Sequence, residues 1–260
     1  MSTPVPPQDS PTAHTIGARV RPLATPAPDP LRWTAMESLA GTLVALVPLT
    51  MDHATGYLDA ANSSDGAYEV FVHLGLGAPT TLAEARQHIA IALAGRARSE
   101  RFPYAQLERG SGRFIGTTSL YEVSPATRSL AIGHTWLGRA WWRSGHNTDS
   151  KLTILRHAFD ILGAVRVVWH TDILNERSQA AIERLGASRE GVLRKHRIRP
   201  DGTWRDTVQY AMTDEDWPGA GAALAARLSP RAPRAAEETS TPGALPGDCA
   251  DDSAAGVATD

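Results

Sequence analysis

A strand signal that lies between two helix signals constrains the fold of this chain most. Apolar residues recur at helical spacing over 151–162, which predicts an amphipathic helix. The run VRVVWHT over 165–171 is rich in β-branched residues and predicts a strand. Asn175 then provides an N-cap and Gly186 a C-terminal stop for a second helix over 175–185. A succession of this kind indicates an α/β or α+β domain.

Strand and helix signals alternate through the rest of the central region as well. Thr81, followed three residues later by Glu84, is typical of a helix start. A turn at Ser124-Pro125 separates two of the predicted strands. We expect helices over 51–61 and from about residue 80 to 98, and strands over 42–49, 102–107, 114–121, 129–137, 191–198 and 204–212. The fold class is therefore α/β or α+β, with a mixed, mostly antiparallel sheet.

Composition changes at both ends of the 260-residue chain. Residues 1–30 hold eight of the eighteen prolines and no aromatic residue, and residues 219–260 also lack aromatic residues. Such segments bury too little apolar surface to offset the entropy lost on folding. We expect both to be disordered, apart from a short frayed helix that 220–228 could form. Residues 31–218 are then expected to form one domain.

Charge and cysteine content exclude several classes of protein. Twenty-six basic against twenty-eight acidic residues leave a net charge of −2, which argues against nucleic-acid binding. A single cysteine, Cys249, excludes a disulfide scaffold, and the histidine spacing indicates no metal site. The longest apolar stretch, 39–49, is too short to span a bilayer, and residues 1–10 do not resemble a secretory signal. We therefore expect a cytoplasmic protein with no membrane partner.

A glycine-containing turn precedes the helix predicted over 151–162. The turn runs from Gly138 to Thr148 and follows a predicted strand directly. Unpaired backbone N–H groups and the helix dipole make such a junction suitable for a phosphate, and Arg143 can add a charged contact. The segment is neither a P-loop nor a dinucleotide fingerprint. Taken alone, the turn fits a surface loop as well as a phosphate site.

Two segments together resemble the GNAT N-acetyltransferase superfamily, in the branch of bacterial ribosomal-protein serine/alanine N-terminal acetyltransferases. They are RSGHNT at 143–148 and the pattern NxxSxxxIxxLGA at 175–187. The resemblance covers about residues 36–218. Further matching motifs are IGHTWL at 132–137, TDSK at 148–151 and RKHRIRPDGTWRDTVQYAM at 194–212. The family's phosphate turn, (Q/R)xxGx(G/A), is matched at Gly145 but not at Trp142 or Asn147.

The resemblance implies a single GNAT-like domain with a splayed pair of parallel strands at its centre and helices on both faces. It implies acetyl-CoA as co-substrate, with the pantetheine arm between the strands that end at Leu137 and near Thr171. Asn175 would meet the pantetheine, and Trp136 lies at the splay. The pyrophosphate would sit on the backbone amides of Arg143, Ser144, Gly145, His146, Asn147 and Thr148.

Acyl transfer from a thioester to an amine sets the remaining requirements: a neutral amine, an N–H donor for the oxyanion and a proton for the thiolate. The resemblance implies a backbone N–H near Leu137 as the oxyanion donor. Ser178 is the candidate partner of the thiol, and the alternative is an ordinary first-turn serine. His134 and His170 are candidate bases, each of which could instead be a packed or solvent-facing residue. Glu122, His196 and Asp206 are further candidates, of which Asp206 fits a structural role better.

Two classes of function stay open at this point. The first is an acetyl-CoA-dependent N-acetyltransferase that acts on a protein N-terminus or a small-molecule amine. The second is a non-catalytic module of the same fold that binds acyl-CoA as a sensor. In either case we expect acetyl-CoA as the ligand, a monomer or homodimer, and no metal or nucleic acid.

Overall fold

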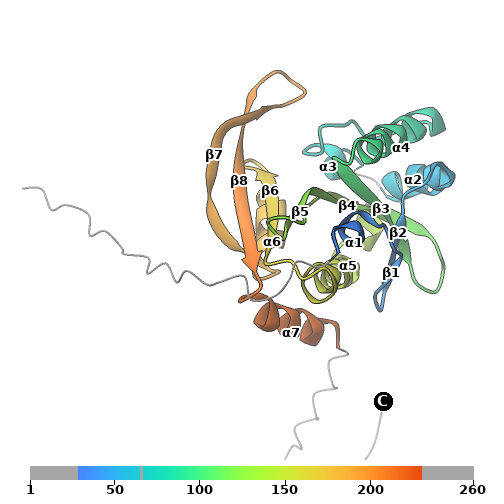
Figure 1. Ribbon diagram of the computed structural model, residues 1–260. Coiled ribbons are helices and arrows are strands. Elements are labelled where there is room, and N and C mark those ends of the chain that lie inside the picture. The colour runs from blue at the N-terminus through green and yellow to red at the C-terminus, as the bar shows by residue number, and fades with distance from the viewer. Residues whose placement is uncertain (1–28, 65–66, 230–260) are drawn as a thin grey trace, which may run out of the picture. The chain divides into compact units, whose positions relative to one another are not determined.

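An eight-stranded mixed sheet organises the part of the chain that the structure describes. The computed structural model describes residues 29–64 and 67–229, and Figure 1 shows their arrangement. The strand order is β1-β2-β3-β4-β5-β6-β8-β7. The strands are β1 (Leu39–Ala40), β2 (Val44–Pro48), β3 (Arg101–Glu108), β4 (Phe114–Ser124), β5 (Ser129–Leu137), β6 (Arg166–Asp172), β7 (Ser188–Ile198) and β8 (Trp204–Thr213).

The parallel pair lies at the centre of the sheet. Strands β5 and β6 run parallel, whereas every other neighbouring pair in the described sheet is antiparallel. Their pairing begins at Ser129↔Arg166 and stops at Ala131↔Val168, although both strands continue beyond those residues. The two strands therefore separate toward their carboxyl ends. This confirms the mixed, mostly antiparallel sheet and its splayed parallel pair.

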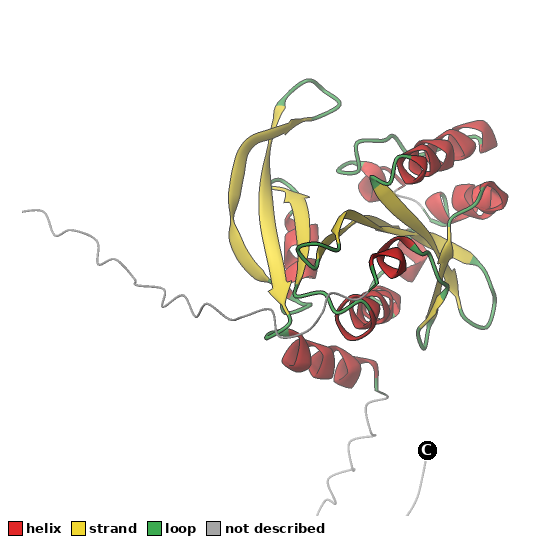
Figure 2. Ribbon diagram, viewed as in Figure 1, coloured by secondary structure: helices red, strands yellow, loops and turns green. Residues whose placement is uncertain are grey.

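Helices cover both faces of the sheet (Figure 2). Helices α2 and α4 pack against β4 and β3, whereas Lys151 of α5 reaches β4 and β5 from the opposite face. The helices are α1 (Pro30–Thr34), α2 (Ala54–Ala61), α3 (Ala67–Phe71), α4 (Leu82–Ala97), α5 (His146–Arg156), α6 (Glu176–Glu183) and α7 (Trp217–Leu228), with 3-10 turns at Met51–His53 and Arg139–Trp141 and a π turn at His157–Ile161.

Local sequence signals explain where two of these helices begin. The Thr81 hydroxyl accepts a hydrogen bond from the Glu84 amide at 3.2 Å, and the Glu84 carboxylate accepts one from the Thr81 amide at 3.2 Å. This reciprocal pair is the predicted capping box of α4. Asn175 caps α6 in a similar way by accepting from the Ser178 amide at 3.0 Å, and Gly186 follows the helix with φ of +93°. Both predicted helix starts are confirmed.

The packed domain extends beyond the boundary expected at residue 218. Helix α7 continues to Leu228 and packs on α5, with Trp217, Ala220 and Leu224 buried. These three residues recur at helical spacing, so the segment has an apolar stripe despite its alanine-rich composition. Residues 219–228 therefore belong to the packed domain rather than to the expected tail, and the helix that 220–228 could form is present as part of α7. The remaining expectations of disorder, for 1–28 and 230–260, lie outside the described residues.

The other differences concern short elements and one helix start. Helix α5 begins at His146, five residues before the expected position, because Gly145 stands at its N-cap in the left-handed region. Short elements α1, β1 and α3 lack a periodic signal long enough to predict them. No helix among the described residues is long and apolar enough to cross a membrane.

Candidate active site

The gap between β5 and β6 exposes a backbone amide of β5. The Gly138 amide donates to the Ile115 carbonyl on the neighbouring strand β4 at 2.8 Å. Successive amides of a strand point to opposite sides, so the Leu137 N–H points away from β4, toward the gap. The Leu137 carbonyl, on the same side, accepts from Trp142 Nε1 at 2.9 Å. An N–H donor therefore lies where the resemblance implies an oxyanion donor.

A bulge in β5 shapes the strand just before that amide. The pairing with β4 shifts between Thr117↔Trp136 and Ser119↔Gly133, and His134 lies within the bulge with φ of +48°. Thr117 Oγ1 donates to the His134 carbonyl at 3.1 Å. A buried glutamine, Gln106, donates from Nε2 to the carbonyls of Thr117 at 2.8 Å and Trp136 at 3.1 Å. The bulge is thus held by side chains from β3 and β4.

The turn before α5 presents unpartnered backbone amides. Gly145 has φ of +87° and Arg143 has φ of +60°. The Asp149 amide donates to the Gly145 carbonyl at 2.9 Å, the first N–H of the helix with a helical partner. Among the described residues, the amides from 143 to 148 have no hydrogen-bond acceptor. Free amides and the helix dipole together make this junction suitable for an anion.

Asp149 attaches this helix to the edge of the sheet. Its carboxylate accepts hydrogen bonds from the amides of Thr42, Leu43 and Val44 at 3.0, 2.7 and 2.9 Å. The side chain is buried, with 2% of its surface exposed. A buried carboxylate that satisfies three backbone donors fixes the turn between β1 and β2 against α5.

Lys151, two residues further along α5, forms a second buried contact. Its Nζ donates to Thr118 Oγ1 at 2.9 Å and to Thr135 Oγ1 at 2.8 Å, and those two hydroxyls lie 2.8 Å apart. No carboxylate of the described residues pairs with it, and burial lowers the pKa of the Lys151 ammonium to about 7. Lys151 thereby links α5 to β4 and to the bulged part of β5.

A pocket lies on the opposite face of the same strands, between β3, β4, β5 and helices α2 to α4. Aromatic rings form much of its wall: Trp136 lies 4.7 Å from Tyr57 and 5.0 Å from Phe71, measured between ring centroids. The pocket residues are Leu49, Tyr57, Phe71, Leu74, Leu76, His88, Ala92, Arg101, Thr117, His134 and Trp136. Trp136 thus faces this pocket, and its ring belongs to the pocket wall.

His134 is the predicted base that reaches the pocket. Its side chain is accessible to solvent there, although the surrounding protein desolvates the ring. This desolvation, together with the charges of Arg101, Arg197 and Arg205, holds the pKa of His134 well below its usual range. A lowered pKa favours the neutral imidazole, which can accept a hydrogen bond but is a weaker base than a free histidine.

His170, the other predicted base, is held by neighbouring side chains. Its Nδ1 lies 3.0 Å from the Tyr121 hydroxyl, and its Nε2 lies 3.2 Å from Gln209 Oε1. Only 8% of the side chain is exposed, and Glu122 Oε2 is 3.9 Å from Nδ1. Because both ring nitrogens have protein partners, a base role for His170 would require one of these contacts to break.

Helix α6 places the other two predicted residues beside the carboxyl end of β6. The Asn175 side chain serves as the N-cap of the helix, so its Oδ1 is already engaged with the Ser178 amide. The Ser178 hydroxyl is half-buried and has no hydrogen-bond partner among the described residues. A hydroxyl of this kind is available to a ligand.

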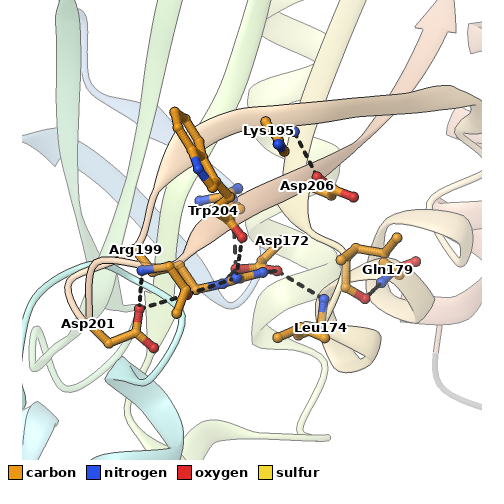
Figure 3. A network of polar contacts seen from close by, with 11 residues as sticks. Asp172, Leu174, Gln179, Lys195, Arg199, Asp201, Trp204 and Asp206 are labelled. Carbon is orange, nitrogen blue, oxygen red and sulfur yellow. Dashed lines mark hydrogen bonds and ion pairs between the residues drawn. The ribbon is translucent and has the colours of Figure 1, made fainter.

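A polar network joins the carboxyl end of β6 to the β7–β8 hairpin (Figure 3). Arg199 binds Asp172 with two hydrogen bonds, Nε to Oδ2 at 2.7 Å and Nη2 to Oδ1 at 2.8 Å. Asp206 Oδ1 accepts from the Lys195 amide at 2.7 Å, which confirms the structural role expected for Asp206. Sequence reasoning missed Asp172, because nothing in its local sequence marks Arg199 as its partner.

Metal ligation has no support in the part of the chain that the structure describes. No group of three or more histidine, cysteine, aspartate or glutamate side chains is placed to hold a metal ion there.

Comparisons with known proteins agree on one family. The family model described as Acetyltransferase (GNAT) domain matches residues 44–188. YdaF of Bacillus subtilis strain 168, assigned as a ribosomal N-acetyltransferase, is 29% identical over 108 residues, which are 42% of this chain. That alignment spans 58% of YdaF, less than two thirds of its length.

Solved structures extend the likeness over most of the described region. An assigned acetyltransferase from T. thermophilus is 38% identical, with a TM-score of 0.65 over 74% of this chain and 97% of that one. Mycobacterium smegmatis RimJ, solved in complex with CoA-disulfide, is 21% identical, with a TM-score of 0.58 over 75% of this chain and 96% of that one. The RimJ likeness concerns the fold alone.

Proposed function

The chain belongs to the GNAT family of N-acetyltransferases, and from that premise we propose that it transfers the acetyl group of acetyl-CoA directly to a primary amine. The observation that carries the proposal is the gap between β5 and β6, which opens beside the unpartnered amides before α5. An acceptor at a protein N-terminus or on a small molecule fits this reaction. The assignment of YdaF as a ribosomal N-acetyltransferase supports the same type of reaction.

The two ends of acetyl-CoA have distinct partners in this proposal. The pyrophosphate binds the amides of residues 143–148, with the exposed Arg143 adding a charged contact. The pantetheine arm lies in the gap beside Leu137, Asn175 and Trp136. What supports this placement is the free Leu137 N–H and the anion-binding character of the helix start.

The reaction joins the amine nitrogen to the thioester carbonyl carbon and breaks the carbon–sulfur bond. The amine gives up one proton and the CoA sulfur takes one, so the products are an N-acetylated amine and free CoA. The Leu137 N–H stabilises the oxyanion, since a preorganised donor acts where negative charge develops. Ser178 donates a hydrogen bond to the departing thiolate.

The proton of the amine requires a separate acceptor. His134 faces the pocket, and its lowered pKa favours the neutral imidazole, which can accept that proton directly or through water. His170 is the alternative base, at the cost of its contact with Tyr121 or Gln209.

Two measurements on the full chain test this function. Calorimetric titration should show that acetyl-CoA and desulfo-CoA bind with similar affinity, because phosphate and pantetheine contacts dominate. Thiol release should then appear when a panel of amines is added with acetyl-CoA. Absence of acetyl-CoA binding would overturn the proposal, and binding without thiol release from any amine would instead support a non-catalytic sensor.

A further inference from the structure

Gln106 is a buried side chain that hydrogen-bonds the peptide group carrying the Leu137 N–H. The residue is 0% exposed, and its Nε2 donates to the Trp136 carbonyl at 3.1 Å and to the Thr117 carbonyl at 2.8 Å. The Trp136 carbonyl and the Leu137 N–H belong to one planar peptide group and point to opposite sides of it. Gln106 therefore holds this peptide group from the side opposite to the gap.

A glycine on β4 lets the two strands approach each other at this point. Gln106, Gly116 and Leu137 lie in register across β3, β4 and β5. A Cβ at Gly116 would lie 2.0 Å from the Trp136 carbonyl oxygen, closer than any side chain allows. The missing side chain leaves room for that carbonyl beside β4, within reach of the Gln106 amide.

Ser150 connects Gln106 to the helix that begins at the anion-binding turn. Its hydroxyl donates to Gln106 Oε1, and Ser150 is also 0% exposed. Ser150 lies near the start of α5, two residues after Thr148, the last of the unpartnered amides. A buried chain of donors thus runs from Ser150 through Gln106 to the Trp136 carbonyl. Hydrogen bonds arranged head to tail in this way polarise one another.

We propose that Gln106 is a positioning residue for acetyl transfer: it fixes and polarises the peptide between Trp136 and Leu137, so that the Leu137 N–H is aimed at the thioester oxygen. Ser150 fixes Gln106 in turn. The inference rests on the proposed function, in which that N–H stabilises the oxyanion. A donor that is already in place needs no reorganisation when negative charge develops. A hydrogen bond accepted by the carbonyl also makes the N–H of the same peptide a stronger donor.

A purely structural role for Gln106 predicts a different outcome. Loss of its contacts would leave buried carbonyls without a donor and lower the free energy of unfolding, whatever the chain does. It would not change the polarisation of a thioester carbonyl bound in the gap, nor turnover relative to affinity. Those two quantities therefore separate positioning from folding.

The carbonyl carbon of bound acetyl-CoA reports the donor without any acceptor amine. [1-13C]acetyl-CoA is added to the full chain, and its carbonyl resonance is compared with that of the free thioester. We expect a downfield shift in the parent, because a hydrogen bond polarises the carbonyl. In Gln106→Met, which keeps the length of the side chain but has no N–H donor, the shift should be smaller. Calorimetric titration should give an affinity for acetyl-CoA close to that of the parent.

Turnover gives the second readout, with any amine that yields thiol release. Gln106→Met should lower kcat about tenfold at an unchanged KM for acetyl-CoA, less than the 10²–10³-fold typical when an oxyanion donor is removed outright. Ser150→Ala should lose less, because Gln106 keeps both carbonyl contacts. Trp217→Phe is the control: it removes a hydrogen bond to Asp160 beyond the C-terminal end of α5 and should keep the parent kcat and carbonyl shift.

Thermal melts verify that each variant folds, and the outcomes distinguish positioning from the proposed function. A carbonyl shift in Gln106→Met equal to that of the parent, or a loss of kcat no larger than in Trp217→Phe, would overturn the positioning role. If Gln106→Met does not fold, Ser150→Ala decides by the same readouts, and if no amine reacts, the carbonyl resonance decides. Bound acetyl-CoA without a downfield shift in the parent would overturn the role of the Leu137 N–H and leave the acetyl-CoA site standing. Failure to bind acetyl-CoA would overturn the proposed function itself.

Discussion

The two faces of strands β4 and β5 differ in how far their polar groups are satisfied by hydrogen bonds. On the α5 face, Lys151 is hydrogen-bonded to Thr118 and Thr135, so the buried polar groups satisfy one another. On the α4 face, Arg101 keeps free donors and His134 lies in a strained bulge beside a pocket. The buried contacts that Lys151 and Asp149 make from α5 form a frame, whereas the α4 face leaves polar groups available for a ligand.

The same strand supplies both faces because side chains alternate along it. Thr135 points toward Lys151, whereas its neighbours His134 and Trp136 line the pocket. A frame that fixes Thr135 therefore also fixes the orientation of His134, Trp136 and the Leu137 amide. The chemistry proposed for the gap depends on contacts that never touch a substrate.

Removing the Asp149 carboxylate should weaken the frame most. Asp149→Ala leaves three backbone amides without their acceptor, which should lower the free energy of unfolding by about 3 kcal/mol or more. Asp149→Asn keeps one acceptor oxygen and should lose less. Urea unfolding measures both, with the exposed Asp59→Ala as control. A loss in Asp149→Ala no larger than in the control would contradict the role given to this carboxylate.

The frame should also carry a pH signature at Lys151. Burial lowers the pKa of Lys151 to about 7 in the folded chain, whereas an unfolded lysine has a pKa of about 10.4. Between these two pH values the unfolded chain therefore binds more protons than the folded chain. Stability should therefore rise with pH through this window. Relative to Lys151→Met, the parent should gain on the order of 2 kcal/mol between about pH 7 and 9.

The control for that comparison is the chain's other lysine, Lys195, which is exposed. Lys195→Met should keep the pH dependence of the parent in urea unfolding at each pH. Parallel stability curves for the parent and Lys151→Met would show that Lys151 titrates normally and that the frame tolerates its charge.

Gly145→Val tests the anion site at the start of α5. At φ of +87° a β-branched residue is strained, and a Cβ would lie 3.2 Å from Leu43 Cδ1. The left-handed backbone is thus the first reason for glycine here, and the flexible Leu43 side chain would have to shift slightly to admit a Cβ. Affinity for acetyl-CoA should fall about tenfold or more as the amides shift.

Gly145→Asn is the matched control, because asparagine tolerates the left-handed region. It should retain more affinity than Gly145→Val, and Arg143→Ala should lose less than Gly145→Val. Calorimetric titration of acetyl-CoA measures all three variants. Unchanged affinity in a folded Gly145→Val would place the phosphates elsewhere.

Ser178→Ala should give the smallest of these effects, confined to turnover. A hydrogen bond to the departing thiolate exists mainly in the transition state, so its loss should lower single-turnover acetyl transfer about tenfold. Affinity for acetyl-CoA should stay near the parent value, and the exposed Ser188→Ala should behave as the parent. A rate within about twofold of the parent would leave Ser178 as a helix residue without a kinetic role.

Sequence patterns predicted the architecture well where the signal is local. The strand over 129–137 and the Asn175 cap depend on neighbouring residues, and the structure has both. Helix α7 was expected only as a short frayed helix over 220–228, because its packing against α5 cannot be read from the local sequence. The short elements α1 and α3 have too few residues to show a period.

In the candidate site, too, local features could be predicted and long-range contacts could not. The turn at 143–148 could be predicted because a glycine and a helix start are adjacent in sequence. Lys151 was missed, since the polarity of a side chain does not reveal its burial. Lys151 finds its partners at Thr118 and Thr135, far along the chain, so only the folded sheet brings them together.

Hydrogen exchange in the presence of acetyl-CoA locates the bound ligand without assuming an acceptor. We expect slower exchange for the Leu137 amide and for the amides of residues 143–148, which lack protein acceptors in the described structure. Amides on the exposed face of α4 should be unaffected. Protection confined to the β7–β8 hairpin or to α4, with none at 143–148, would contradict the placement of acetyl-CoA at the gap between β5 and β6.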